Sequence, residues 1–290
     1  MNVKKEGKRM VTGYNLHLDK NTSEFQSYIK CGESHLSEQK AKISDCLQNY
    51  IINGIADGTR LGKEWFPEIE ADIFISHSHA DEKLAKGLAG WLHSTFGLNC
   101  FIDSCVWGYS DKLLENINDE YSDKQVKKEG GYIYNHEKCN TASKHVNTML
   151  TIALYKMIDK TEVTFLLNTD NVISKYADVY QQATYSPWIY SEIICTEIVR
   201  KKPISQYRDK DGLMHFFEKS ELGNDGFSAA YEVSLEHLNE LDMQCLLEWK
   251  NLYEKHKVKY PLDSLYKLTY EEETRNIPVS YTHLRAHETE

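Results

Sequence analysis

The sequence has no long hydrophobic run. No apolar stretch approaches the roughly 20 residues that a helix needs to span a bilayer. The first twenty residues, MNVKKEGKRMVTGYNLHLDK, are basic but contain neither an apolar core nor a small-residue cleavage site, so we expect that they are not a secretory signal. We therefore expect a cytoplasmic protein with no membrane partner.

The sequence also lacks paired cysteines. None of its seven cysteines is spaced as CxxC, which argues against a zinc ribbon or a thioredoxin-type site. An odd, scattered set in a cytosolic chain indicates free thiols packed as small hydrophobic side chains. No Cys/His signature suggests a catalytic cysteine.

Positive charge is in deficit. The chain has 34 Lys and Arg against 44 Asp and Glu, a formal net charge of −10. Such a surface repels phosphate backbones, so we expect no nucleic-acid partner. A small anionic ligand in a local pocket is not excluded. The composition, 41% hydrophobic and 27% charged, is that of an ordinary globular protein.

Apolar spacing predicts alternating helices and strands. Residues 22–56 have the pattern of two amphipathic helices, and the turn-rich stretch 57–67 that follows is expected to be a connector. ADIFISHS (71–78) is then a buried strand. Asp81 is placed to cap a helix that runs to about Phe96 and ends at Gly97.

The same alternation continues to residue 256. We predict a loop at 104–110 and an exposed insertion at 119–142. Further strands are predicted at 99–103, 161–169 and 229–235, and helices at 111–117, 145–160, 186–202 and 236–256, with Ser186 and Pro187 as N-cap and first residue of the helix at 186–202. Strands alternating with helices imply a parallel sheet with helices on both faces.

Polar clusters follow three of these strands. They are Ser76-His77-Ser78, the stretch from Asp103 to Trp107, and the loop at Asn168. In an open parallel sheet the ligand lies outside the carboxyl ends of the strands, near the switch in strand order. The candidate site residues therefore fall where such a fold binds its ligand.

Three segments resemble the TIR (Toll/interleukin-1 receptor) domain family. DIFISHSHAD (72–81) is similar to the first strand and loop of that family, and GLNCFIDSCVWGYSD (97–111) to the second. SPWIYSEI (186–193) is similar to the box in which a Trp, three residues and a Glu carry the catalytic glutamate. The resemblance covers roughly residues 71–240 and is closest to prokaryotic proteins of the antiphage-defence (Thoeris-like) type.

The resemblance implies a flavodoxin-like α/β domain at 71–240 that cleaves the nicotinamide–ribose bond of NAD⁺. NAD⁺ is then a substrate, and no cofactor or metal is expected. The family further implies an ADP-ribose-type signal, a downstream effector that senses it, and homo-oligomers formed through the TIR domain. Two features depart from the family: the loop between Asp111 and His145 is long, and the usual fourth strand has only PISQYRD (203–209) as a candidate.

The chemistry needs few groups. Nicotinamide leaves NAD⁺ as a neutral base, so no acid has to protonate it, and the oxocarbenium-like transition state needs negative charge in a dry pocket. Glu192 lies within roughly 60° of Trp188, Ile189 and Val199 around the helix, so its carboxylate leaves an apolar face, where burial is expected to raise its pKa. Glu197 points about 140° away. The alternative is a solvated surface glutamate.

The remaining candidates each have a functional and a structural interpretation. Trp188 lies one turn before Glu192 and is expected to wall the pocket. Ser76 and His77 offer backbone N–H groups to a phosphate, or form a polar turn. Asp103 and Trp107 cover the dinucleotide, with Trp107 stacking on a base, or they are a turn residue and a core residue.

Three other functions compete. HSHAD (77–81) matches all but the last position of the HxHxDH zinc box of metallo-β-lactamase-like hydrolases, but residue 82 is Glu. A non-enzymatic TIR interaction module is the main alternative. A nucleoside deoxyribosyltransferase-like enzyme would share the fold and the glutamate chemistry.

The two ends of the chain are expected to lie outside the TIR domain. Residues 1–70 are predicted to be an N-terminal helical extension and 241–278 a C-terminal helix. VSYTHLRAHET (279–289) resembles a translated frame of a transposon adapter from sequencing libraries, so we treat 279–290 as an artefact and the native C-terminus as missing.

Overall fold

The computed structural model divides the chain into two compact units, Met1–Glu240 and Leu241–Glu290. The structure describes residues 13–18, 22–39, 47–52, 55–107, 110–127, 130–176, 180–199 and 231–275. The predicted strand candidate at 203–209, the last residues of the helix at 186–202 and the adapter-like tail lie outside the described residues.

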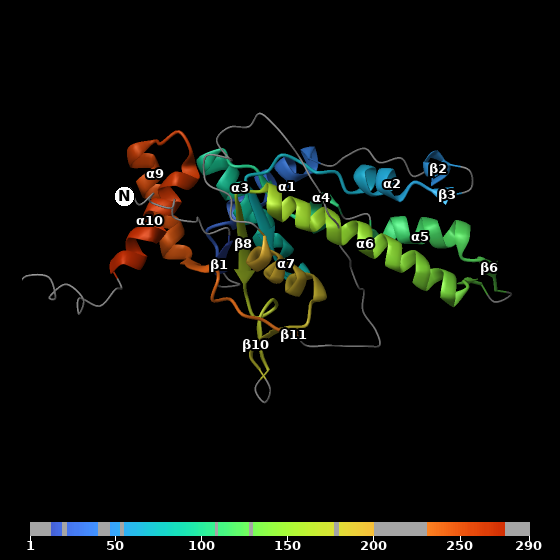
Figure 1. Ribbon diagram of the computed structural model, residues 1–290. Coiled ribbons are helices and arrows are strands. Elements are labelled where there is room, and N and C mark those ends of the chain that lie inside the picture. The colour runs from blue at the N-terminus through green and yellow to red at the C-terminus, as the bar shows by residue number, and fades with distance from the viewer. Residues whose placement is uncertain are drawn as a thin grey trace, which may run out of the picture. The chain divides into compact units, whose positions relative to one another are not determined.

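A five-stranded parallel sheet forms the centre of the larger unit (Figure 1). Its strands lie in the order β12-β1-β8-β4-β5, and the pairings of β1 with β8, β8 with β4 and β4 with β5 are parallel. The bounds are β1 Gly13–His17, β4 Ile73–Ser76, β5 Cys100–Phe101, β8 Val163–Asn168 and β12 Asn239–Asp242. The sequence-based prediction of a flavodoxin-like α/β sheet is confirmed.

The N-terminal segment supplies a strand that the sequence pattern does not predict. A flavodoxin-like sheet has the strand order 2-1-3-4-5. If β4, β5 and β8 are counted as its first three strands, β1 occupies the place of the fourth and β12 that of the fifth. Tyr14 and Leu16 are fully buried, so residues 13–17 belong to the sheet rather than to a helical extension before it.

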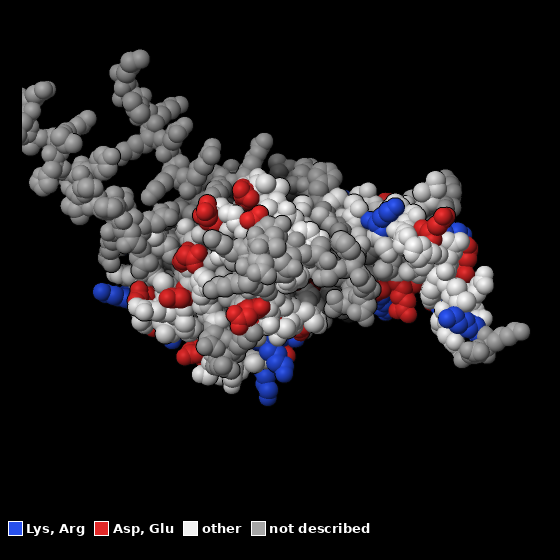
Figure 2. Space-filling view, turned by 90° about the horizontal axis from the view of Figure 1, so that it is seen from below, with Lys and Arg blue, Asp and Glu red and all other residues white. Residues whose placement is uncertain are grey.

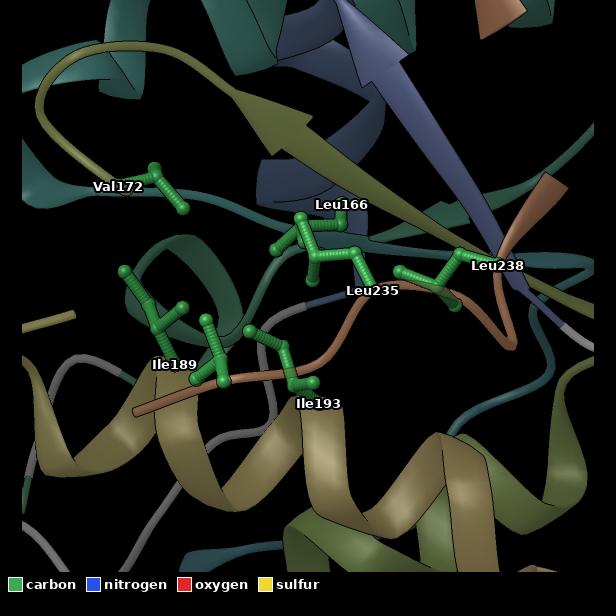
Figure 3. Close-up of a cluster of buried hydrophobic side chains, with 7 residues drawn as sticks. Leu166, Val172, Ile189, Ile193, Leu235 and Leu238 are labelled. Carbon is green, nitrogen blue, oxygen red and sulfur yellow. The ribbon is translucent and has the colours of Figure 1, made fainter. Parts of the chain in front are cut away.

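Helices cover both faces of this sheet (Figure 1). Helices α1 (Ile29–Glu38) and α3 (Glu82–Phe96) cover one face, and α6 (His136–Lys160) and α7 (Pro187–Ile198) the other. Successive residues of a strand point to opposite faces. Thus Leu166 of β8 packs with Ile189 and Ile193 of α7 (Figure 3), whereas the ring of Phe165 meets Tyr14 of β1 at 5.7 Å.

The region before β4 differs from the two helices that were predicted. The first is present, as the short 3-10 turn η1 (Gln26–Tyr28) followed by α1. In place of the second lie the turn η2 (Leu47–Tyr50) and a hairpin of β2 (Ile51–Ile52) and β3 (Ile55–Ala56). The predicted connector at 57–67 holds helix α2 (Gly58–Trp65), because Asp57 caps it by accepting the Arg60 N–H and Trp65 anchors it in the core.

The predicted loop and insertion also contain regular structure. Residues 103–106 form the short helix α4 (Asp103–Val106), and α5 spans Ser110–Tyr121. The insertion holds a hairpin of β6 (Gln125–Val126) and β7 (Tyr132–Ile133) and the first residues of α6. Helix α6 starts nine residues earlier than predicted because Asn135 accepts the N–H groups of Glu137 and Lys138.

A second small sheet follows β8. It consists of β9 (Ser174–Tyr176), β10 (Tyr180–Thr184) and β11 (Tyr231–Glu232), paired antiparallel. The strand predicted at 229–235 is therefore β11 of this sheet. The helix predicted to start at residue 236 starts at Met243, because residues 239–242 extend as β12.

The smaller unit contains two helices, α9 (Met243–His256) and α10 (Pro261–Arg275), instead of one. Trp249 is fully buried between them, and its indole N–H donates to the Pro261 carbonyl at 3.0 Å and the Ser264 hydroxyl at 3.2 Å. In the parts of the chain that the structure describes, no helix has the length and apolar character needed to cross a membrane.

Candidate active site

Glu192 projects from the buried side of α7. Ser186 caps this helix by accepting the Ile189 N–H at 3.3 Å, and Pro187 is its first residue, as the sequence predicts. The Glu192 side chain is only 4% exposed, and Ile189 and Ile193 beside it are equally buried. Glu197 is exposed. The carboxylate therefore leaves the apolar face, and the alternative of a solvated glutamate does not hold.

The Glu192 carboxylate contacts the end of a central strand. Ser76 is the last residue of β4, is 2% exposed and donates a hydrogen bond from Oγ to Glu192 Oε2. Strand β4 lies between β5 and β8, where the strand order reverses. Ligands of open parallel sheets bind at this switch point, beyond the carboxyl ends of the strands. The structure thus brings together two residues that lie 116 positions apart and that the sequence separately suggests for the site.

His77 forms a second polar pair next to this contact. Its ring is buried, and Nε2 lies 3.3 Å from Oγ of Ser104. Within the described residues, Nδ1 makes no hydrogen bond of standard geometry. Burial lowers the pKa of His77, although nearby carboxylates, Asp103 first among them, act in the opposite direction. Burial thus disfavours the charged imidazolium, and the direction of the hydrogen bond between Nε2 and the Ser104 hydroxyl depends on the tautomer of the ring.

Ser104, in the segment after β5, is a site residue that the sequence does not single out. Asp103 is the half-buried first residue of α4, and its charge acts on His77. Ser104 follows it and supplies the hydroxyl beside His77. Its position directly after a strand end is a signal for a site residue, but a serine in a polar loop is too common for the sequence to single it out.

Trp107 is a core residue. It is 2% exposed, its indole N–H donates to the Pro67 carbonyl at 3.1 Å, and its ring packs edge-on against Phe101 at 4.6 Å. A ring enclosed in this way has no face left for a base. Of the two interpretations, the structure favours packing over stacking on the dinucleotide. Trp188 is half-buried, one helical turn before Glu192.

Asp81 does not cap α3 as predicted. It occupies the N-cap position, but its side chain makes no capping bond. Its carboxylate is 6% exposed and accepts hydrogen bonds from Thr169 Oγ1 at 2.5 Å and Asn171 Nδ2 at 2.8 Å. Because its carboxylate accepts from two donors in the loop after β8, Asp81 fastens that loop to the start of α3.

The geometry does not favour the zinc hypothesis. His77 is buried, whereas the side chain of His79 is 89% exposed and lies 3.7 Å from Glu82. Asp81 is engaged with the loop after β8. Among the residues that the structure describes, no three or more His, Cys, Asp and Glu side chains are arranged to hold a metal ion.

The surface charge agrees with the net charge of the sequence. On the face shown in Figure 2, acidic side chains of the described residues are scattered over the surface, and basic side chains lie at its margins. The described part of this face thus offers no broad basic area to a phosphate backbone.

Comparison with known proteins adds no relative: no family model, no curated protein and no solved structure matches the chain.

Proposed function

We propose that the protein is a TIR-type NAD⁺ nucleosidase, a hydrolase or cyclase that breaks the nicotinamide–ribose bond with Glu192 as its catalytic carboxylate. One observation carries the proposal. A glutamate that is 4% exposed, in the Trp-x₃-Glu box of α7, meets the Ser76 hydroxyl at the strand-order switch of a parallel sheet. Burying a carboxylate is costly, so a glutamate at such a place indicates a use for it.

In the proposed reaction the bond between ribose C1′ and the nicotinamide nitrogen breaks, and the bonding electrons leave with the neutral base. Positive charge then develops at C1′ and the ring oxygen. Glu192 stabilises this charge or holds the ribose hydroxyls, in surroundings of low polarity that strengthen the interaction. Ser76 orients the carboxylate, and Trp188 packs beside the ribose. At the end of the neighbouring strand, the site is lined by His77, Ser104 and Asp103. The oxygen of water or of a hydroxyl of the substrate then bonds to C1′ and releases its proton to solvent.

The wider role follows the resemblance to antiphage-defence TIR proteins. The product would be an ADP-ribose-type signal, made in the cytoplasm by a homo-oligomer and sensed by a downstream effector. The negative surface is compatible with a small nucleotide substrate bound in a local site and argues against a nucleic-acid partner.

The test is incubation of the purified protein with NAD⁺, with and without lysate of phage-infected cells, followed by mass spectrometry of the products. We expect nicotinamide and an ADP-ribose product from the wild type. Glu192→Gln should abolish both, whereas Glu197→Gln, on the same helix but exposed, should leave them unchanged. Circular dichroism confirms that both variants fold. Nicotinamide release by Glu192→Gln would remove this residue from catalysis.

The alternative is a non-enzymatic TIR interaction module. It is favoured by two hairpins with exposed apolar side chains, among them Ile55 at 74% and Val126 at 77% exposure. Exposed apolar side chains gathered on hairpins are typical of interaction surfaces. Absence of NAD⁺ turnover under all conditions, together with self-association that Ile55→Ser and Val126→Ser prevent, would support this function instead.

A further inference from the structure

A polar network joins three strands at the edge of the central sheet. Asn15 of β1 is 2% exposed and donates from Nδ2 to both carboxylate oxygens of Glu240, at 3.0 and 3.1 Å. His17 Nε2 lies 2.6 Å from Glu240 Oε2, and Asn168 Nδ2 donates to Asn15 Oδ1 at 2.9 Å. Neither the TIR resemblance nor the proposed mechanism uses these four residues.

The strand register places this network on the same side of the sheet as Glu192. Leu166 of β8 is the Cα partner of both Ser76 and Asn15, and His17 is the partner of Asn168, two residues further along. Side chains of paired residues share a face, and so do those of residues i and i+2. Since Ser76 reaches Glu192 and Leu166 reaches α7, the network lies on the α7 face at the carboxyl ends of the strands. Two strand spacings, about 10 Å, separate β1 from β4.

The network presents hydrogen-bond acceptors. An ionised carboxylate only accepts, so at 2.6 Å the His17 ring donates from Nε2 to Glu240, and in the tautomer with its proton on Nε2 the other ring nitrogen, Nδ1, is an acceptor. The side-chain amide oxygen of Asn168 and the remaining lone pairs of the Glu240 carboxylate are acceptors too. The side chains of His17 and Glu240 are 52% and 66% exposed, so a ligand can reach them. A carboxylate repels phosphate, whereas hydroxyl groups donate to all three acceptors.

We propose that Asn15, His17, Asn168 and Glu240 form a subsite for the vicinal hydroxyls of a second ribose. The inference rests on the proposed function, because a dinucleotide carries two riboses joined by a pyrophosphate. Glu192 acts at the nicotinamide ribose, and Glu240, held in orientation by Asn15 and His17, accepts hydrogen bonds from the adenosine ribose. Glu192 and Glu240 thus place two carboxylates on the α7 face at the carboxyl ends of the strands, one for each ribose of a dinucleotide.

The same contacts would also fasten β12 to β1, so the test needs a readout that a purely structural role leaves unchanged. Discrimination between a ligand with the two hydroxyls and one without them is such a readout. The probes are ADP and 2′,3′-dideoxy-ADP, which differ only at the proposed contact. Their binding is measured by calorimetry and does not require catalytic turnover.

We expect wild type to bind ADP about tenfold more tightly than dideoxy-ADP, as for loss of a hydrogen bond to a charged group. Glu240→Gln should lose most of this preference, His17→Asn part of it, and the exposed control Glu197→Gln none. Equal binding of the two probes by wild type, failure of wild type to bind ADP, or a full preference in Glu240→Gln would overturn the subsite.

The outcome is separable from that of the proposed function. Glu192→Gln should keep the preference for ADP while losing NAD⁺ turnover, and Glu240→Gln should raise the KM for NAD⁺ with little change in kcat. A hydroxyl preference without any NAD⁺ cleavage would refute the nucleosidase and retain the ribose subsite. NAD⁺ cleavage without a preference for the hydroxyls would support the nucleosidase and refute the ribose subsite.

Discussion

Thr169 donates a 2.5 Å hydrogen bond to Asp81 and thereby ties the loop after β8 to the start of α3. Both residues are buried; Asp81 lies shortly after β4, the strand that ends at Ser76, and Thr169 directly after the neighbouring strand β8. The contact ties together the segments that follow two neighbouring strands, which gives Asp81 a positioning role that its place in the HSHAD motif does not reveal.

Asp81→Asn should therefore destabilise the protein. The amide has one acceptor oxygen in place of two and adds a donor facing Thr169 or Asn171, so we expect the free energy of unfolding to fall by about 1–3 kcal/mol. Chemical denaturation measures the change. Asp123→Asn is the matched control, because Asp123 is half-exposed and its ion pair with Lys138 lies on the surface. The backbone of residue 123 has a positive φ, which asparagine tolerates as well as aspartate does. Equal stability of the two variants would contradict the role given to Asp81.

The elements that the sequence predicts well are those with strong local signals. Strand β4 follows from three consecutive β-branched or aromatic residues, and α7 from Ser186 and Pro187 at its start. The position of Glu192 beside Ile189 on α7 follows from helical geometry, but only the packing of α7 against β8 shows that this side of the helix is buried.

The elements that the sequence does not reveal depend on distant pairing. Strand β1 has only five residues, two of them Asn15 and His17, and it is recognisable as a strand only beside β8, some 150 residues later. The ribose subsite was missed for the same reason. Trp107 shows the converse: its sequence position at a strand end suggests a ligand contact, but packing against Phe101 decides its role.

Ser76→Ala should impair turnover more than folding. The variant removes one hydrogen-bond donor to a buried carboxylate whose orientation the proposed chemistry requires. We expect kcat for NAD⁺ to fall at least about tenfold, equivalent to roughly 1.4 kcal/mol of transition-state stabilisation. Ser76→Thr retains the hydroxyl and should recover part of the rate. Steady-state kinetics of the two variants decide the point, and unchanged kcat in Ser76→Ala would show that this contact does not orient Glu192.

Gly90→Ala should loosen the helix layer over one face of the sheet. A Cβ atom at residue 90 would lie 2.2 Å from the Tyr28 carbonyl oxygen and 2.6 Å from the Gly32 nitrogen, both backbone atoms that cannot turn aside. Overpacking of this kind costs about 1–3 kcal/mol or more. Gly58→Ala is the control, because its Cβ would meet only the flexible Met149 side chain at 3.3 Å and alanine favours the helix. Thermal denaturation should separate the two variants clearly; similar melting temperatures would mean that α1 and α3 are not so closely packed.

His35 should make the fold sensitive to acid. Its Nε2 accepts hydrogen bonds from the Cys100 N–H on edge strand β5 and from Gln39, whose amide also donates to the Cys100 carbonyl. Burial and the stacked ring of His93 lower the pKa of His35, while Glu38 and Asp72 act in the opposite direction.

The sign of the pH dependence follows from this shift. The folded state binds the proton less readily than the unfolded chain, in which His35 has a pKa of 6.5, so stability is complete above that pH and is lost as the pH falls below it. His35→Gln should reduce the change in the denaturation midpoint between pH 7.5 and pH 5.5. His79→Gln, at an exposed position, should leave that change as it is in the wild type. An identical pH slope in wild type and His35→Gln would exclude this residue as a source of acid sensitivity.

Cys195 should be inert towards alkylation although it lies one turn from Glu192. Burial, with the charges of Asp159 and Glu192, raises its thiol pKa to about 12, so almost no thiolate exists at pH 8. Cys139, which is half-buried on α6, serves as the internal comparison. Iodoacetamide should label Cys139 within minutes and Cys195 only after denaturation, as peptide mass spectrometry will show. NAD⁺ turnover should survive the labelling of accessible thiols, because the proposed chemistry uses a carboxylate. Rapid labelling of Cys195 with parallel loss of turnover would place a reactive thiol at the site and contradict the glutamate mechanism.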